Sequence, residues 1–230
     1  MRNLRLPTLV FSSSLAAVVA FTGPIPVFHQ EPEMVVDEEA LKQESQALKA
    51  IAAMDAVFVG ASKCKSCHNK ESAGGIHDKW ESMKHAHAFE VLKSDEAIAV
   101  AKEMGIEDPT KSADCMKCHD TGYTEPDERK HRRFKTELGV QCETCHGPGS
   151  EHVKARLAAA KEEEVEEGVL RQIGEGEIVM PDVQLCLSCH NDESPSFKPL
   201  DLEKALKTIQ HMHPKREKPR VTVPMKKKEG

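Results

Sequence analysis

The sequence predicts a mostly α-helical protein with long loops and few strands. Long stretches in which apolar and polar residues alternate are absent, and such stretches are the usual signal for half-buried strands. Four segments instead show helical spacing of apolar residues, at 80–92, 95–104, 151–167 and 202–213. Aromatic residues make up only 4% of the 230 residues. That is too few for a conventional core, so we expect something else to fill the interior.

The amino terminus has the features of a secretory signal. Arg2 and Arg5 precede a mostly apolar stretch, and Val18-Val19-Ala20 supplies small residues of the kind that signal peptidase recognises. We expect residues 1–28 to be a signal peptide or, if they remain uncleaved, an N-terminal membrane anchor. No other segment is long and apolar enough to cross a bilayer. The expected location is therefore periplasmic or exported.

The rest of the chain divides by composition. Residues 29–57 form an N-terminal segment with an expected surface helix over 38–54, and 58–214 contain every cysteine. The tail, 215–230, carries seven Lys or Arg and two Glu, whereas the whole chain has a net charge of −6. We expect this basic tail to be disordered and solvated. An acidic, exported protein is a poor partner for nucleic acid, so we exclude that class.

All eight cysteines occur in four C-x-x-C-H motifs. These motifs are Cys64–His68, Cys115–His119, Cys142–His146 and Cys186–His190, here called the first to the fourth. This spacing is typical of covalent haem c attachment, in which two cysteines form thioethers and the next histidine binds iron. The sequence therefore predicts four covalently bound haem c groups. Their attachment residues are Cys64, Cys67, Cys115, Cys118, Cys142, Cys145, Cys186 and Cys189, and their iron ligands are His68, His119, His146 and His190.

Three other interpretations of the cysteines are weaker. Zinc would not require a histidine directly after the second cysteine of every pair. Pairs of cysteines three residues apart make a poor disulfide framework. Thioredoxin-like redox pairs would need a βαβ pattern around each motif, and none is visible. We therefore expect a multihaem cytochrome c whose helices and long loops pack around four haems, and whose haem-free chain unfolds without cooperativity.

The remaining histidines are candidates for the sixth iron ligand. If residues 80–92 form one helix, His85 shares a face with Ala88, Phe89 and Leu92, and His87 points elsewhere. If 202–213 form one helix, His213 lies on its apolar stripe and His211 on the opposite, solvated side. His152 follows the third motif too closely to bind the same iron as His146, so we expect it to reach a different one.

Several runs resemble the cytochrome c-554 family. They are Gly139–Gly149 with the third motif, the first motif with Trp80 and His85, Asp120–Tyr123, and Met212-His213. The resemblance implies that His152 is the sixth ligand of the haem on His68. It likewise implies His85 for the haem on His146 and His213 for the haem on His190.

The sixth ligand of the iron on His119 is less clearly indicated by the sequence. In the best-known member of that family, the corresponding haem is five-coordinate and faces an open pocket. This sequence departs there, because the segment between His190 and His213 is shorter than its counterpart, and about five extra residues that include His77 precede Trp80. From the sequence, the His119 iron is therefore either five-coordinate or capped by His87, His131 or His77.

Two functions follow from these ligands. Bis-histidine haems leave no site for a substrate, which indicates an electron-transfer protein between redox partners. The partners that the resemblance implies are a multihaem oxidoreductase such as a hydroxylamine oxidoreductase-like protein, and a downstream cytochrome or quinone-linked protein. The alternative is an oxidoreductase acting on nitric oxide, nitrite or hydroxylamine at an open iron on His119. A structural or anchoring subunit of a respiratory complex is a third interpretation, supported only by the N-terminal segment and the basic tail.

Overall fold

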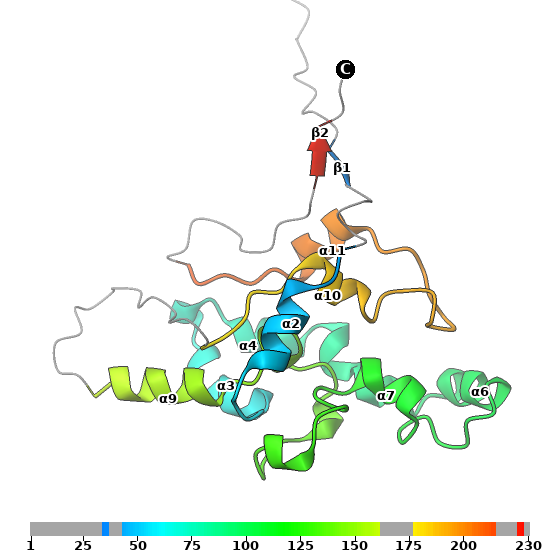
Figure 1. The fold of residues 1–230 in the computed structure, drawn as a ribbon, viewed down its shortest axis with the longest axis horizontal. Coiled ribbons are helices and arrows are strands. Elements are labelled where there is room, and N and C mark those ends of the chain that lie inside the picture. Colours follow the sequence, from blue (N-terminus) through cyan, green and yellow to red (C-terminus); the bar gives the residue numbers. More distant parts are fainter. Residues whose placement is uncertain (1–33, 37–42, 162–176, 215–224, 228–230) are drawn as a thin grey trace, which may run out of the picture.

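The computed structural model describes residues 34–36, 43–161, 177–214 and 225–227, and most of them form short helices joined by loops (Figure 1). The predicted class, mostly α with few strands, is confirmed. The α-helices are α2 (Gln46–Ala53), α3 (Ala61–His68), α4 (Ile76–Glu81), α5 (Ala88–Val91), α6 (Asp95–Glu103), α7 (Ala113–His119), α8 (Cys142–His146), α9 (Ser150–Ala159), α10 (Val183–Leu187) and α11 (Leu202–Ile209). The 3-10 turns are η1 (Glu71–Ala73), η2 (Lys84–His87), η3 (Asp127–Arg129) and η4 (Thr136–Leu138). The expected signal or anchor lies outside the described residues.

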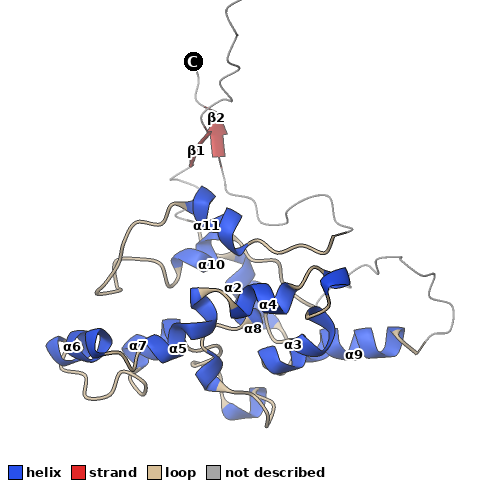
Figure 2. Cartoon of the chain, turned by 180° about the vertical axis from the view of Figure 1, so that it is seen from behind, coloured by secondary structure: helices blue, strands red, loops and turns tan. Residues whose placement is uncertain are grey.

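The helices are arranged along one long axis. The α6 and α9 helices lie at opposite ends of it, with α3, α4 and α8 between them and α10 and α11 to one side (Figures 1 and 2). Beyond α11, the strands β1 (Met34–Val36) and β2 (Met225–Lys227) pair in antiparallel fashion. The β2 strand is the described part of the basic tail, and the other tail residues lie outside the described ranges. Within those ranges, no helix has the length and apolar character that a membrane span needs.

Helix starts follow the capping residues in the sequence. The side chains of Ser45, Ser94, Asp182 and Asp201 accept hydrogen bonds from backbone N–H groups in the first turns of α2, α6, α10 and α11. The α6 helix matches the expected 95–104 segment to within one residue. The α2 helix is shorter than the expected 38–54, because Ser45 caps it at Gln46. The α9 helix ends at Ala159, and residues 162–167 of its expected range lie outside the described residues.

The expectation of one helix over 80–92 is wrong. The α4 helix ends at Glu81, Met83 is extended with φ −91° and ψ 156°, and the chain continues as η2 and α5. The break is stabilised from outside the segment. The indole N–H of Trp80 donates to the carbonyl of Val140 at 2.9 Å, and the Val140 N–H donates to the carbonyl of His85 at 3.0 Å. A tertiary contact with a later segment therefore replaces local helical hydrogen bonds.

The expectation of one helix over 202–213 is also wrong. Leu202 and Leu206 on the predicted stripe are buried, but the helix ends at Ile209 and Gln210 is extended, with φ −56° and ψ 130°. The Lys79 ammonium group of α4 donates to the carbonyl of Gln210. The chain beyond Gln210 also packs against the segment just before α4. The Met212 carbonyl lies so close to Gly74 that a Cβ at this glycine would collide with it. Helical periodicity therefore does not place His211 and His213.

The side-chain core of the described residues is small. One cluster contains Ala61, Trp80 and Ala86, and a second contains Phe89, Leu92 and Met116. Cysteines of the attachment motifs pack against both clusters, Cys142 against the first and Cys115 against the second. Short helices of this length are marginal alone, so they depend on tertiary contacts. These contacts converge on the attachment motifs.

Candidate haem-binding site

Each attachment motif lies at the C-terminal end of a short helix. The first, second and third motifs end α3, α7 and α8 at their histidines. In the fourth motif, Cys186 lies in α10, and Cys189 and His190 follow in the next turn. Cysteines three residues apart on a helical turn lie on neighbouring positions of one face. Each motif therefore presents both sulfur atoms and the histidine from one compact segment.

The third motif clamps the first through two buried side chains. The carboxylate of Glu143 accepts hydrogen bonds from the N–H groups of Val59, Gly60 and Gly149 at 2.7–2.8 Å. The amide oxygen of Gln141 accepts from the N–H of Ala61 at 2.8 Å. Both side chains are at most 2% exposed. Burial raises the pKa of Glu143, although the three N–H groups favour the charged form. These bonds fix the start of α3 against α8.

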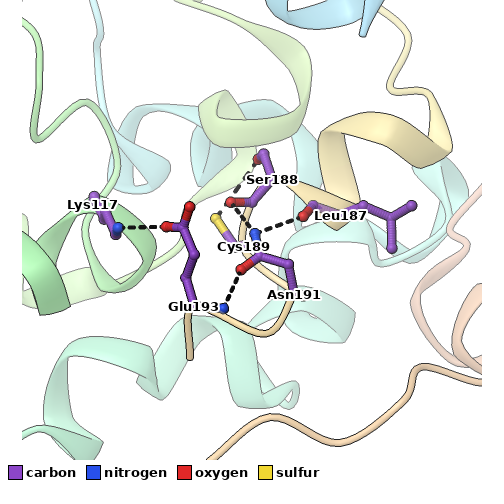
Figure 3. Close-up of polar contacts among 6 residues, drawn as sticks. All are labelled: Lys117, Leu187, Ser188, Cys189, Asn191 and Glu193. Atoms are coloured by element: carbon purple, nitrogen blue, oxygen red, sulfur yellow. Dashed lines mark hydrogen bonds and ion pairs between the residues drawn. The ribbon is translucent and has the colours of Figure 1, made fainter. Parts of the chain in front are cut away.

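The second motif is held against the fourth by two contacts. The Cys118 thiol hydrogen-bonds to the sulfur of Cys189, which raises the pKa of Cys118 and lowers that of Cys189 to about 7. The ammonium group of Lys117 pairs with the carboxylate of Glu193 at 2.7 Å, just past the fourth motif (Figure 3). Asn191 shapes this turn by donating to the carbonyls of Leu187 and Ser188 (Figure 3).

The first and third motifs show a similar cysteine contact. A hydrogen bond between their sulfur atoms raises the pKa of Cys64 and lowers that of Cys142. None of the eight cysteines forms a disulfide with another in the structure. Among the described residues, which include every cysteine, the one group of three or more His, Cys, Asp or Glu whose ligand atoms lie together is His77, Asp78 and Glu81. No cysteine belongs to that group.

Three of the motif histidines face another histidine ring. The ring centres of His68 and His152 are 6.2 Å apart. Those of His190 and His85 are 6.0 Å apart, and those of His146 and His211 are 5.9 Å apart. The three separations are nearly equal although the partners come from three different segments, α9, η2 and the chain after α11. The histidines are therefore brought together by tertiary structure.

These separations fit two ligands on one iron atom. Two imidazole rings that bind a metal from opposite sides, with metal–nitrogen bonds of about 2 Å as in zinc sites and about 1.1 Å more to each ring centre, have centres about 6 Å apart. Rings in direct stacking contact would lie closer than this. The residues present therefore fit a bis-histidine haem at each of three motifs.

Hydrogen bonds also leave the correct nitrogen free for a metal. The Nδ1 atoms of His119, His146 and His211 lie 2.6, 2.9 and 3.0 Å from the backbone carbonyls of Ala88, Val179 and Ile209. A carbonyl only accepts, so each Nδ1 carries the proton and each Nε2 has a free lone pair. Such bonds fix the tautomer and orientation of metal-binding histidines.

Burial keeps several of these histidines neutral, which is the form that binds metals. Desolvation lowers the pKa of His68, and the neighbouring His152, His211, His213 and His77 lower it further. Burial lowers the pKa of His85, and His190 adds to the effect. Burial also lowers the pKa of His146. The site therefore favours uncharged imidazoles near neutral pH.

The structure differs from the pairing that the family resemblance implied. His152 lies against His68, as expected, but His85 lies against His190 and not against His146. His211 is exposed, as expected, but its ring also lies against that of His146. The physical reason is the end of α11 at Ile209, because the chain beyond it follows contacts with α4 and not the helical face. The assignments of His85, His152 and His213 as iron ligands stay predictions.

His119 differs from the other three motif histidines. Among the described residues, it makes no ring contact with another histidine. Its expected caps lie elsewhere: His87 is exposed with Nε2 3.0 Å from the carbonyl of Glu81, and His131 is exposed with Nδ1 3.2 Å from the N–H of Arg133. His77 is buried beside Trp80, with ring centres 5.2 Å apart. In the described part of the chain, the second motif therefore lacks the facing histidine seen at the other three.

Three acidic residues of the site were missed by the sequence interpretation. They are Glu143, Asp182, which hydrogen-bonds to Ser45, Ala47 and Leu185, and Glu177, which contacts His152. Glu143 is one of the two residues between the cysteines of the third motif. The motif does not specify these residues, so the sequence does not indicate that Glu143 is buried. Asp182 has the sequence signature of a helix cap, four residues before Cys186. Nothing near Glu177 in the sequence indicates its contact with His152.

Comparisons with known proteins show which sequences this chain resembles. Residues 63–147 match the protein-family model described as cytochrome c554 and c-prime. A cytochrome c-554 of Nitrosomonas europaea is 39% identical over 101 residues, which cover 42% of this chain and 41% of that protein. The aligned part thus spans less than half of the relative's length. No solved structure matches the chain.

The attachment motifs, the free Nε2 atoms and the paired histidines together define a c-type cytochrome. Within that class, the region of residues 63–147 is similar to the cytochrome c-554 family. The match covers the first three motifs, and cytochromes of the c type bind haem covalently through such motifs. The fourth motif lies outside the matched residues, and its case depends on its own Cys186, Cys189 and His190.

Proposed function

We propose that the protein is an electron carrier with four haem c groups, three of them bound by two histidines. The observation that carries this proposal is the set of three histidine pairs with ring centres 5.9–6.2 Å apart. The pairs are His68 with His152, His190 with His85, and His146 with His211. A bis-histidine iron has no open position, so it exchanges electrons without binding a substrate.

Contacts between motifs support transfer along the chain. The first motif touches the third through Cys64 and Cys142, and the second touches the fourth through Cys118 and Cys189. Burial raises the pKa of Cys145, and the nearby Cys186, Cys142 and Cys189 raise it further. Groups attached at these sulfur atoms would be close neighbours. Haem iron supplies the one-electron chemistry, and the chain fixes the distances between the four sites.

The partners and location proposed are those of an exported carrier. The partners would be redox proteins, namely a multihaem oxidoreductase of the hydroxylamine oxidoreductase type and a downstream cytochrome or quinone-linked protein. The apolar residues 6–28, after Arg2 and Arg5, support export to the periplasm, and attachment to a membrane would follow only if they stay uncleaved. Nucleic acid is not proposed as a partner.

An optical spectrum tests the proposal. The protein would be produced with c-type maturation, reduced with dithionite and measured before and after addition of carbon monoxide. Haem absorption with no more than about one haem in four responding to carbon monoxide would agree with three six-coordinate irons. Absence of haem bands, or a response from two or more haems, would contradict the proposal.

A second candidate function is supported by the second motif. Because no histidine faces His119 among the described residues, a haem there would offer an open position to a small nitrogen compound such as nitric oxide, nitrite or hydroxylamine. The neighbouring fourth motif would then supply electrons. Carbon monoxide binding by one haem, combined with turnover of one of these compounds, would favour this candidate. Carbon monoxide binding without turnover would leave the carrier function.

A further inference from the structure

The carboxylate of Glu177, which is mostly buried, lies next to His152, the expected sixth ligand of the haem on His68. The Oε2 atom of Glu177 is 3.2 Å from Nδ1 of His152. The same oxygen is 3.2 Å from Nε and 2.5 Å from Nη2 of Arg156. His152 and Arg156 lie one turn apart on α9, whereas Glu177 comes from the segment that leads to α10. The three side chains are only 15–26% exposed.

This arrangement is different at each of the other haem-site histidines that donate through Nδ1. His119, His146 and His211 donate to neutral backbone carbonyls. His152 donates to a negatively charged carboxylate. On the opposite side of the same pair, Nδ1 of His68 is buried and has no hydrogen-bond partner. Of the two histidines of this pair, only His152 therefore has its imidazole polarised by a hydrogen bond to a charged group.

A carboxylate that accepts the Nδ1 proton has two effects on a histidine ligand. It fixes the ring so that Nε2 points to the metal, and it increases the electron density on Nε2. A more basic ligand stabilises the ferric state over the ferrous state, as does the nearby negative charge. Both effects lower the reduction potential of the bound iron. Limited exposure preserves them, because solvent screens a partly buried pair less than an exposed one.

We propose that Glu177 is a positioning residue that lowers the reduction potential of the haem held by His68 and His152. This inference rests on the proposed function, since it requires His152 to be that haem's sixth ligand. Arg156 holds the carboxylate in place and offsets part of its charge. The haem of the first motif then accepts an electron less readily than it would without Glu177, which biases the direction of electron flow through the protein.

The test is a redox titration of the fully matured holoprotein carrying Glu177→Gln. Glutamine keeps an acceptor oxygen and a similar shape but removes the charge. We expect one of the four one-electron steps to become about tenfold more favourable for reduction, which corresponds to about +59 mV. The other three steps should not move. The ferric low-spin signal of that one haem in electron paramagnetic resonance should change with it.

Glu151→Gln is the matched control. Glu151 lies next to His152 on α9, but its carboxylate pairs with the exposed Lys154 at 3.2 Å. The same charge is removed from the same helix, without the bond to the histidine. We expect no shift in any of the four steps. If Glu177→Gln and Glu151→Gln give the same titration curve as the wild type, or as each other, the proposal is overturned.

Arg156→Gln should shift the reduction potential in the opposite direction. It also provides a second test if the Glu177→Gln protein does not mature. Loss of the guanidinium leaves the full carboxylate charge beside His152, so the same step should become less favourable for reduction. An upward or absent shift would contradict the proposal.

His152→Ala separates failure of this inference from failure of the proposed ligation. If His152→Ala turns one haem high-spin while Glu177→Gln is silent, only the role of Glu177 is refuted. If all haems stay low-spin in His152→Ala, the ligation and the inference both fail.

Discussion

The first and second motifs have the same five-residue pattern but different surroundings. His68 faces His152 across 6.2 Å, whereas His119 has no facing histidine among the described residues. The buried carboxylates beside the two motifs differ as well. Glu143, which clamps the first motif, accepts three backbone N–H bonds, but Oδ1 of Asp120, next to His119, is buried without a hydrogen-bond partner. Identical attachment sequences therefore acquire different chemistry from the segments that fold over them.

The largest effect should come from removing the facing histidine of the first motif. His152→Ala leaves that iron with one protein ligand, so one haem should change from low-spin to high-spin and the number of haems that bind carbon monoxide should rise by one. Optical spectroscopy with a carbon monoxide titration measures both. Lys154→Ala, on the same helix and exposed, should change neither. An unchanged count in His152→Ala would remove the distinction between the two motifs.

The third motif tests which residue after α11 is its partner. The ring of His211 lies 5.9 Å from that of His146, so His211→Ala should produce one high-spin haem. The helical-face argument from the sequence assigned this behaviour to His213 and not to His211. The two single variants, compared by their spin-state spectra, decide between structure and periodicity. A high-spin haem in His213→Ala alone would favour the sequence-based assignment.

Removing the charge of Glu143 should destabilise the first and third motifs together. Glu143→Gln weakens hydrogen bonds from Val59, Gly60 and Gly149 to a buried carboxylate, and bonds to charged groups contribute about 1.5–3 kcal/mol each. We expect a loss of about 4 kcal/mol in the free energy of unfolding of the holoprotein. Denaturant titration measures it. Glu151→Gln, at the surface, should change stability by less than about 0.5 kcal/mol.

The second motif should respond to pH through Asp120. Burial raises the pKa of this carboxyl to about 6 from an ordinary value of 3.8. The folded state therefore favours the protonated form, so this stabilisation is present below about pH 4 and is lost as the pH rises through 6, by about 3 kcal/mol in all. In Asp120→Asn this loss should vanish. Thermal unfolding of both proteins from pH 4 to 7 tests it, and parallel curves would show that Asp120 does not titrate in this way.

Local sequence determined much of the fold. Serine and aspartate caps set the starts of α2, α6, α10 and α11, because their side chains bond N–H groups only a few residues away. The absence of alternating patterns predicted the scarcity of strands. The apolar stripe through Leu202 and Leu206 predicted which side of α11 is buried. Each of these features depends on neighbours within one or two helical turns.

The attachment motifs were determined in the same way. A thioether pair and its histidine occupy five consecutive residues, so their chemistry is visible without a fold. The sequence alone therefore predicts that the eight cysteines and the histidines at 68, 119, 146 and 190 bind haem. The comparisons support this interpretation for the first three motifs.

The partners of these histidines were decided by tertiary structure. His85 lies 105 residues before His190, and His211 lies 65 residues after His146, so no periodic pattern relates the members of either pair. Two expected helices were also broken by distant contacts, 80–92 by Val140 and 202–213 by Lys79. Hydrogen bonds and packing across the chain outweigh local helix propensity in such short elements. The sequence specifies where haem is attached, and the folded chain specifies what lies on the other side of it.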